Sequence, residues 1–486
     1  MRPVVLLLAA GAWMLCADAS GEPFDPLKLQ PLGRQAAVEA RADYDARLGE
    51  LAYLYSVPPF LHLRQRYEFL SAVTRYFPQL GNPYGQFMHV RAPAGGKTTD
   101  TMPNNDTLYG AAYLDLEATS YVLSLPAIDG RYYGYSFHDA YFYNFDVVSS
   151  RTDGANAGNY LIVGPAWKGT APRGIRRVIR APTNSINIYE RIYYRNAADV
   201  PHVNGIQDAV RLQPLARFLN PKATVALPDP QGALSVNPKS LDSALDMFQM
   251  ANDYMGRNPP PDTDRAYLEQ FAALGIGPGL TVSDDPAKRQ AILQGVAMAE
   301  KTLSALVDTV MQTRNGWQIP PPHLGVRGGD SGIALQAMVQ LRSIGYGSPK
   351  EATYLQAYVD EAGEPLHASQ PYTLTFPRDQ LPPVNPATHG FWSVTLYDRA
   401  KFRFFDNPYQ KFNVRAADPL VYDADGSLTI YVQQEKPSDP ALFPNWLPAP
   451  PSGDFVLMLR AFQGGPAVIE GRYVPPFVRA AARPLQ

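Results

Sequence analysis

Residues 104–109, with the sequence Asn-Asn-Asp-Thr-Leu-Tyr, hold the first group of side chains that could do chemistry. The amide of Asn105 and the carboxylate of Asp106 stand directly before Tyr109, at the start of a segment with alternating apolar residues. Such groups can cap a loop, bind a cation through oxygen, or hold a sugar or carbonyl substrate. The residues alone leave a structural loop and a ligand or metal site both open.

Residues 130–141 form the densest polar and aromatic stretch of the chain. Strand alternation would place Arg131 and Tyr135 on one face and His138 on the other. Asp139 could orient His138 only if the chain bends between them, because neighbours on a straight strand point to opposite faces. A solvent-facing or core histidine remains the alternative to a catalytic one.

These two stretches suggest one pocket in the first half of the chain. In that hypothesis Asp106 or Asp139 is the general acid or base, His138 is the proton partner, and Arg131 binds a carboxylate. The expected pocket residues are Asn105, Asp106, Tyr109, Arg131, Tyr135, His138 and Asp139.

A second set of candidate binding residues lies near the C-terminus, at Trp392, Asp398, Asn445 and Trp446. Indole rings beside amide and carboxylate groups are typical of sugar or aromatic-ligand sites, since apolar ring faces need aromatic area and polar edges need hydrogen bonds. Burial of the same residues in a core is the simpler alternative.

Several classes of site are excluded by spacing or charge. The 7 histidines form no H-x-H or H-E-x-x-H pair, so a zinc site of the usual spacing is absent, and no G-x-S-x-G motif occurs. Asp423 to Ser427 begins like a calcium loop but lacks the glutamate at its twelfth position, so a turn explains it better. A net charge of −2 argues against a nucleic-acid surface. Any bound metal or cofactor stays unknown at this level.

The N-terminus has the pattern of a secretory signal peptide. Arg2 precedes an apolar run from Val4 to Leu15, and Ala17 and Ala19 form an A-x-A cleavage site. The run is shorter than the ~20 residues of a membrane span, and no later segment is suitable. We therefore expect residues 1–19 to be removed and a periplasmic or secreted chain without cysteine, since Cys16 is the single one.

Proline, at 47 of 486 residues, and aromatic residues, at 11%, favour short strands and ordered loops over a helical bundle. We expect helices at 34–56 and 61–77, separated by Pro58 and Pro59, and further helices at 241–255, 265–274, 286–313 and 332–344. Period-two segments predict strands at 108–116, 121–125, 132–138, 141–148, 160–163, 175–181, 185–194, 372–376, 391–397, 428–433 and 455–462.

These segments predict a mainly β fold with helical segments. We expect a helical lead-in over 20–80, a first β module over 81–204, a helical insert over 205–360 and a second β module over 361–486. Each module is expected to be an antiparallel, jelly-roll-like β-sandwich. The two modules show no close sequence repeat.

Longer strings resemble two known families. Asn105 to Tyr109, Leu114-Asp115-Leu116 and residues 161–169 resemble domain-of-unknown-function family 1254, while residues 391–398 and 445–450 resemble family 1214. The resemblance implies a bacterial, often exported protein with tandem jelly-roll-like domains, and it makes a homo-oligomer plausible. It assigns no reaction.

Two functions remain open at the level of sequence. The first is an exported protein that binds or acts on a small organic or glycan-like ligand, and the second is a non-catalytic structural or envelope-associated protein. The first predicts that at least four of the expected pocket residues share one concave pocket, whereas scatter among separate turns favours the second.

Overall fold

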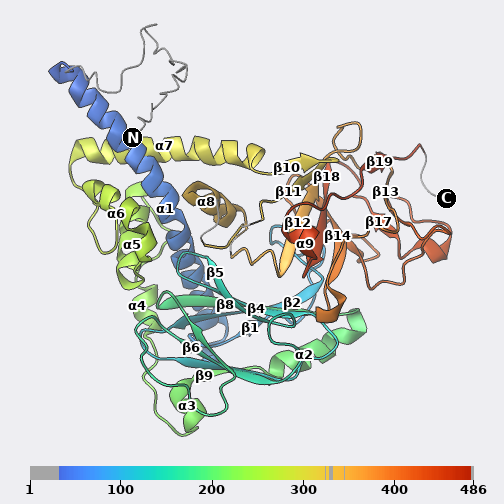
Figure 1. Ribbon diagram of the computed structural model, residues 1–486, viewed down its shortest axis with the longest axis horizontal. Helices are drawn as coiled ribbons and strands as arrows, with labels where there is room; N and C mark the ends of the chain where they lie inside the picture. The colour runs from blue at the N-terminus through green and yellow to red at the C-terminus, as the bar shows by residue number, and fades with distance from the viewer. Residues whose placement is uncertain (1–31, 323, 328–331, 344, 483–486) are drawn as a thin grey trace, which may run out of the picture. The chain divides into compact units, whose positions relative to one another are not determined.

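The computed structural model describes residues 32–322, 324–327, 332–343 and 345–482, so the expected signal peptide lies outside the described residues. Residues up to Tyr44 form a separate unit, and the unit from Asp45 onward holds the described strands. The strands of this unit make four sheets, and the helices stand mostly apart from them (Figure 1). No helix among the described residues is long and apolar enough to cross a membrane.

The first β-sandwich consists of a five-stranded and a four-stranded sheet. The five-stranded sheet has the order β1 (Met88–His89), β2 (Thr107–Asp115), β8 (Ser185–Tyr193), β4 (Tyr133–His138) and β5 (Asn144–Ser149). The four-stranded sheet has the order β7 (Arg177–Arg180), β6 (Gly158–Val163), β3 (Tyr121–Leu125) and β9 (Arg211–Pro214). Alternate residues such as Leu114, Ile188 and Ile162 point between the two sheets and form a buried core.

The second β-sandwich consists of a six-stranded and a four-stranded sheet. The six-stranded sheet has the order β10 (Gln312–Arg314), β11 (Trp317–Ile319), β12 (Ala352–Ala357), β18 (Phe455–Phe462), β14 (Phe391–Asp398) and β15 (Asn413–Arg415). The four-stranded sheet has the order β17 (Trp446–Pro448), β16 (Leu428–Gln433), β13 (Tyr372–Phe376) and β19 (Val478–Ala480). Leu374, Val394 and Leu457 belong to the core between them.

The two sandwiches share one topology. The order β2-β8-β4-β5 in the first corresponds to β12-β18-β14-β15 in the second, and β7-β6-β3-β9 corresponds to β17-β16-β13-β19. In each four-stranded sheet one pair is parallel, β6 with β7 and β16 with β17, while the other pairs are antiparallel. The repeat that the sequence does not reveal is therefore present in the strand order.

The helical part has its own core. It contains α1 (Arg34–Tyr76), α5 (Ala244–Arg257), α6 (Arg265–Phe271), α7 (Pro286–Thr309) and α8 (Gly332–Arg342), whereas α2 (Val200–Ala209), α3 (Leu215–Leu219), α4 (Pro230–Leu234) and α9 (Pro466–Ile469) lie outside it. Ile292, Ala299 and Leu303 form a buried apolar stripe on α7, and Asp285 caps the helix by accepting a hydrogen bond from the Ala287 N–H at 2.8 Å.

The expected break at Pro58 and Pro59 is wrong, because α1 runs through both prolines as one helix. Both rings are buried among the apolar residues of the helical core. A proline inside a helix costs about 3 kcal/mol through its missing hydrogen bond and its clash with the preceding turn. Packing of this part of α1 against α5 and α7 offsets that cost, and local sequence cannot show such packing.

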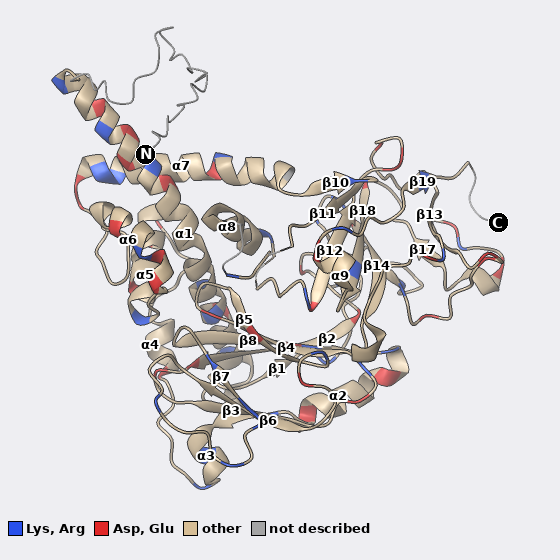
Figure 2. Ribbon diagram, in the orientation of Figure 1, with Lys and Arg blue, Asp and Glu red and all other residues tan. Residues whose placement is uncertain are grey.

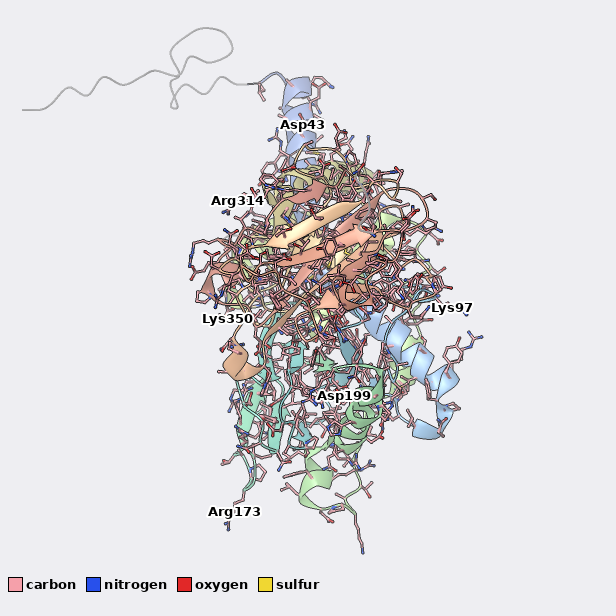
Figure 3. All side chains as sticks on the ribbon, turned by 90° about the vertical axis from the view of Figure 1, so that its right-hand side faces the viewer. Asp43, Lys97, Arg173, Asp199, Arg314 and Lys350 are labelled. Atoms are coloured by element: carbon pink, nitrogen blue, oxygen red, sulfur yellow. The ribbon has the colours of Figure 1, made fainter. Side chains whose placement is uncertain are left out.

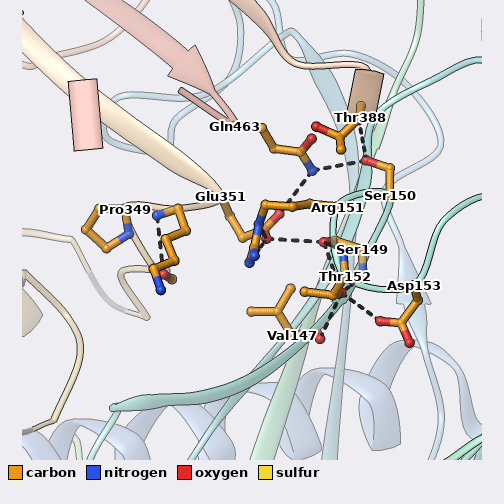
Figure 4. Close-up of polar contacts among 12 residues, drawn as sticks. Val147, Ser149, Ser150, Arg151, Thr152, Asp153, Pro349, Glu351, Thr388 and Gln463 are labelled. Atoms are coloured by element: carbon orange, nitrogen blue, oxygen red, sulfur yellow. Dashed lines mark hydrogen bonds and ion pairs between the residues drawn. The ribbon is translucent and has the colours of Figure 1, made fainter. Parts of the chain in front are cut away.

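The two sandwiches are joined by a buried carboxylate. Glu351, before β12, accepts hydrogen bonds from Arg151 Nε at 2.8 Å and from the Ser149 hydroxyl at 3.1 Å (Figure 4). Ser150 donates to the Thr388 carbonyl at 2.8 Å and accepts from Gln463 Nε2 at 3.0 Å. Because these contacts link residues 200 to 313 positions apart, they hold the sheet of β5 to the sheet of β12.

Candidate functional site

The candidate site lies on the face of the five-stranded sheet that points away from the first sandwich core. Strands β2, β8 and β4 are neighbours, so residues in register form rows across this face. We call the row of Tyr109, Arg191 and Gly134 the arginine row, and the row of Tyr113, Asn187 and His138 the histidine row. A row of Ala111, Tyr189 and Ser136 lies between them.

The second sandwich presents an equivalent row to the same region. On β12, β18 and β14 the residues in register are Tyr354, Arg460 and Ser393. Strand for strand they correspond to Tyr109, Arg191 and Gly134, so both sandwiches place a tyrosine and an arginine at the same position. Each guanidinium lies over the ring of its neighbour, at 5.3 Å for Arg191 and Tyr109 and at 5.9 Å for Arg460 and Tyr354.

The two arginines differ in their partners. Arg460 donates to Thr395 Oγ1 at 2.8 Å and to the Tyr397 hydroxyl, and the carboxylate of Asp106 is among the groups that raise its pKa. Among the described residues, neither arginine has a carboxylate within 4.0 Å, and the buried Nε of each has no hydrogen-bond partner. Arg191 differs in that the Tyr109 hydroxyl is its hydrogen-bonding side chain, so it has fewer partners within the protein than Arg460.

Arg191 remains charged in this environment. Burial acts to lower its pKa, but the phenol groups of Tyr109, Tyr354 and Tyr132 outweigh burial and raise the pKa above the ordinary value. Arg191 is largely buried, but part of its surface is accessible to water. The same holds for Tyr109, Tyr189, Tyr346 and Tyr354.

The histidine row is the closed end of this face. His138 and Asn187 are fully buried, and Tyr113 is nearly so. Burial, together with the charge of Arg191, lowers the pKa of His138 to about 3, so the imidazole is neutral near pH 7. A neutral imidazole can donate one hydrogen bond and accept another, but at this pKa it is a weak base.

Of the expected pocket residues in the first module, Asp106, Tyr109 and His138 belong to this face or its edge. Asp106 accepts hydrogen bonds from Ser393 Oγ at 2.7 Å and Asn413 Nδ2 at 2.6 Å, so it joins β2 to the second sandwich. Burial raises its pKa, against the opposing effect of Arg460. Its neighbour Asn105 is buried, and the main-chain carbonyl of Asn105 accepts a hydrogen bond from the Tyr194 hydroxyl.

The structure places the other expected pocket residues elsewhere. Arg131 forms an ion pair with Asp199 at 2.9 Å, and Figure 3 labels that aspartate. Tyr135 points into the first sandwich core. Asp139 accepts the N–H of Tyr141 at 2.8 Å in the turn after β4, where the chain bends away from His138. These side chains have structural partners and do not converge on one pocket.

The candidates in the second module also have structural contacts. Trp392 packs in the sandwich core, and Asp398 accepts the N–H of Lys401 at 2.7 Å in a turn. Asn445 is buried and donates to the carbonyls of Val421 and Thr429, and the indole of Trp446 donates to Gln433 O at 2.9 Å. None of these contacts involves the arginine row.

Sequence reasoning missed Arg191 and Arg460 as site residues. Each stands in a strand whose other residues are largely apolar, in 185–193 and in 455–462. A charged residue on a buried face of such a strand must have a special partner. The charge within each largely apolar strand is therefore the signal that could have pointed to the two arginines. For cations, the described residues contain no group of three or more His, Cys, Asp or Glu side chains arranged to hold a metal ion.

Fold and site together define a tandem β-sandwich protein with a solvent-accessible arginine between its two sandwiches. Residues 84–214 match the family described as "Protein of unknown function (DUF1254)", and residues 351–466 match "Protein of unknown function (DUF1214)". The chain thus belongs to the proteins in which a DUF1254 domain is followed by a DUF1214 domain. The resemblance seen in the sequence is confirmed.

One solved structure agrees with this fold. The crystal structure of the VPA0106 protein from Vibrio parahaemolyticus has a TM-score of 0.69 and 23% sequence identity, over 90% of this chain and 100% of that one. An uncharacterized protein from Burkholderia cenocepacia has a TM-score of 0.43 and 14% identity, over 92% of this chain and 96% of that one. No curated protein matches the sequence.

Proposed function

We propose that this protein binds a small organic anion, and that the carboxylate of this ligand pairs with Arg191. The observation that carries the proposal is a charged arginine that lies between the sandwiches, is only partly exposed, and has no carboxylate within 4.0 Å among the described residues. A guanidinium binds a carboxylate through two parallel hydrogen bonds, which gives both affinity and orientation.

The surrounding residues favour an aromatic or otherwise flat ligand. Tyr109, Tyr189 and Tyr354 each expose part of their surface beside Arg191. Aromatic side chains offer apolar ring faces and a polar hydroxyl edge, which suits a flat acid better than a compact inorganic ion. This refines the expected small organic ligand and moves the carboxylate contact from Arg131 to Arg191.

Isothermal titration calorimetry with 3-phenylpropanoate and its uncharged amide tests the proposal. We expect the acid to bind at least about tenfold more tightly than the amide, because a charge-assisted hydrogen bond contributes roughly 1.5–3 kcal/mol. Arg191→Gln should remove this preference. The matched control is Arg180→Gln, since Arg180 is exposed on β7 over the ring of Trp167. Unchanged binding to Arg191→Gln would refute the site.

A structural or envelope-associated role without catalysis is the second candidate. It is favoured by the use of Asp106, Asp139, Asp398 and Asn445 in internal hydrogen bonds. Basic and acidic residues are interspersed along the elements that Figure 2 shows, which suits neither role in particular. A protein that binds neither 3-phenylpropanoate nor other small acids would support this second role.

We also propose that the chain is exported after removal of residues 1–19. The support is the charged start, the apolar run and the A-x-A pattern of the sequence. Intact mass and N-terminal sequencing of protein from the periplasmic fraction should give a chain that begins at Ser20. A chain that retains Met1 in the cytoplasm would contradict export.

A further inference from the structure

The histidine row holds several buried polar atoms without partners. Both ring nitrogens of His138 and both amide atoms of Asn187 lack a hydrogen bond of ordinary geometry to a described residue; the main chain of Gly345 and Tyr346 lies near His138, and His62 lies near Asn187. His138 and Asn187 are register partners on β4 and β8, so their side chains stand next to each other on one face. Four such atoms therefore share one small region.

His62 of α1 covers the same region. Its Nδ1 lies 2.7 Å from the Tyr254 hydroxyl, its Nε2 has no partner, and its ring lies 5.7 Å from that of Tyr113 in the histidine row. Burial lowers the pKa of His62, the charge of Arg66 lowers it further, and an interaction with the Asn187 side chain opposes this shift. The region thus contains neutral imidazoles and an amide, which offer donors and acceptors but no charge.

Such an arrangement is costly for a structural core. Each buried polar group left without a partner destabilises a fold by about 1–3 kcal/mol, whereas an apolar residue of similar shape would avoid this cost. Most buried polar groups in native proteins have partners, and a cluster of exceptions calls for an explanation. One such explanation is a ligand group that completes these hydrogen bonds. It agrees with the position of the cluster, which lies beside the arginine row.

We propose that the histidine row is an uncharged hydrogen-bonding subsite, so that the ligand is an organic acid with a hydroxyl, carbonyl or amide group remote from its carboxylate. This inference rests on the proposed binding of the carboxylate by Arg191. Asn187 and Arg191 lie four residues apart on β8, which separates their backbones by about 13 Å. Between them, the side chains of Ala111 and Ser136 are small, and the body of the ligand would lie beside Tyr189, against which Gly345 also packs.

A pair of acids that differ by one hydroxyl group tests the subsite on the full chain. The probes are 3-phenylpropanoate and 3-(4-hydroxyphenyl)propanoate, measured by isothermal titration calorimetry. We expect the hydroxylated acid to bind at least about tenfold more tightly, because a site built to hydrogen-bond a hydroxyl rejects an analogue that lacks it. His138→Phe and Asn187→Leu should reduce the ratio toward one while binding of the acid itself persists.

The thermal midpoint of each variant gives an independent readout. If the polar atoms serve a ligand, His138→Phe and Asn187→Leu should keep or raise the midpoint, since they remove unpaired buried groups. Equal binding of the two acids to the wild type, or an unchanged ratio in both variants, would overturn the subsite and mean that these atoms only hold water. If a variant fails to fold, the ratio of the affinities of the wild type for the two acids still tests the subsite.

Failure of the underlying proposal looks different. If the wild type binds neither acid, Arg191 is not a carboxylate site, and the subsite proposal falls with it. If both acids bind equally and Arg191→Gln abolishes binding, the carboxylate site stands and only the subsite is refuted.

Discussion

At the scale of single residues, burial decides what each polar group can do. Arg191 and Arg460 occupy equivalent strand positions, yet only Arg460 has Thr395 and Tyr397 as hydrogen-bond partners. His138 lies among residues that keep it neutral, so it suits hydrogen bonding better than proton transfer. The chemistry of this face is thus set by neighbours from other strands and from the other sandwich.

The lowered pKa of His138 predicts a pH-dependent stability. The unfolded chain protonates this histidine near pH 6.5, whereas the folded protein holds it neutral down to about pH 3. Stability contributed by the neutral form is therefore present above pH 6.5 and is lost as the pH falls through this window. Linkage gives a loss of about 2 kcal/mol between pH 7 and pH 5.

Urea unfolding at pH 7 and pH 5 measures the pH-dependent contribution of His138 to the free energy of unfolding. The wild type should lose about 2 kcal/mol more than His138→Phe between the two values, because phenylalanine cannot be protonated. Taking the difference between the two proteins removes the effect of buried carboxyls such as Asp106, whose raised pKa acts in the opposite direction. Equal pH dependence of the two proteins would contradict the assignment.

At the scale of elements, close approaches fix where strands, helices and loops lie. Gly295 of α7 lies against α1, since a Cβ atom there would stand 2.4 Å from the Glu50 nitrogen. Gly345, in the loop before β12, lies against Tyr189 in the same way, since an added Cβ atom would stand 2.2 Å from Tyr189 Cε2. This loop covers the middle of the site face, so its backbone helps to hold Tyr189 in place.

Gly345→Ala should disturb this contact. Gly345 has φ 69°, and Gly363 has φ 83° with no atom within 4 Å of its added Cβ, so the second position is a matched control. Both substitutions strain the backbone by about 1–2 kcal/mol. Gly345→Ala should lose roughly 1–3 kcal/mol more, because it also collides with Tyr189. Equal losses in urea unfolding would show that the loop moves aside freely.

At the scale of the whole molecule, the two sandwiches are held together by specific contacts. Tyr132 and Tyr193 of the first pack against Phe391 of the second, with ring centroids 5.8 Å and 4.4 Å apart. The Glu351 and Asp106 hydrogen bonds cross the same boundary. Burial raises the pKa of Glu351, and Arg151 opposes that shift, so the carboxylate depends on its partner.

Differential scanning calorimetry should therefore show one unfolding transition for both sandwiches. Arg151→Ala leaves the buried Glu351 carboxylate without its cation and should destabilise the protein by about 1–3 kcal/mol. The whole transition should shift, and Glu351→Gln in the same chain should restore part of the loss, since an amide is less costly to bury. Two separate transitions in the wild type would show that the sandwiches unfold independently.

Local patterns were sufficient for most elements of the fold. Strands 121–125, 372–376, 428–433 and 455–462 were predicted with the bounds that the structure has, because period-two alternation reflects burial on one face. The cap at Asp285 and the apolar stripe of α7 follow from the same kind of local rule. By contrast, short strands such as β15 and β17 have little alternation of their own and were not predicted.

Tertiary packing decided the remaining features. Alternation shows that Arg191 shares a face with Asn187 and Tyr189, but not that Tyr354 of the other sandwich lies across from it. The helix is not broken at Pro58 and Pro59, because packing of helix against helix stabilises it. Local propensity does not include this packing energy, so the sequence pattern predicted a break. Strand order brings residues far apart in the chain into one site, and the free energy that selects this order comes from burial between whole sheets.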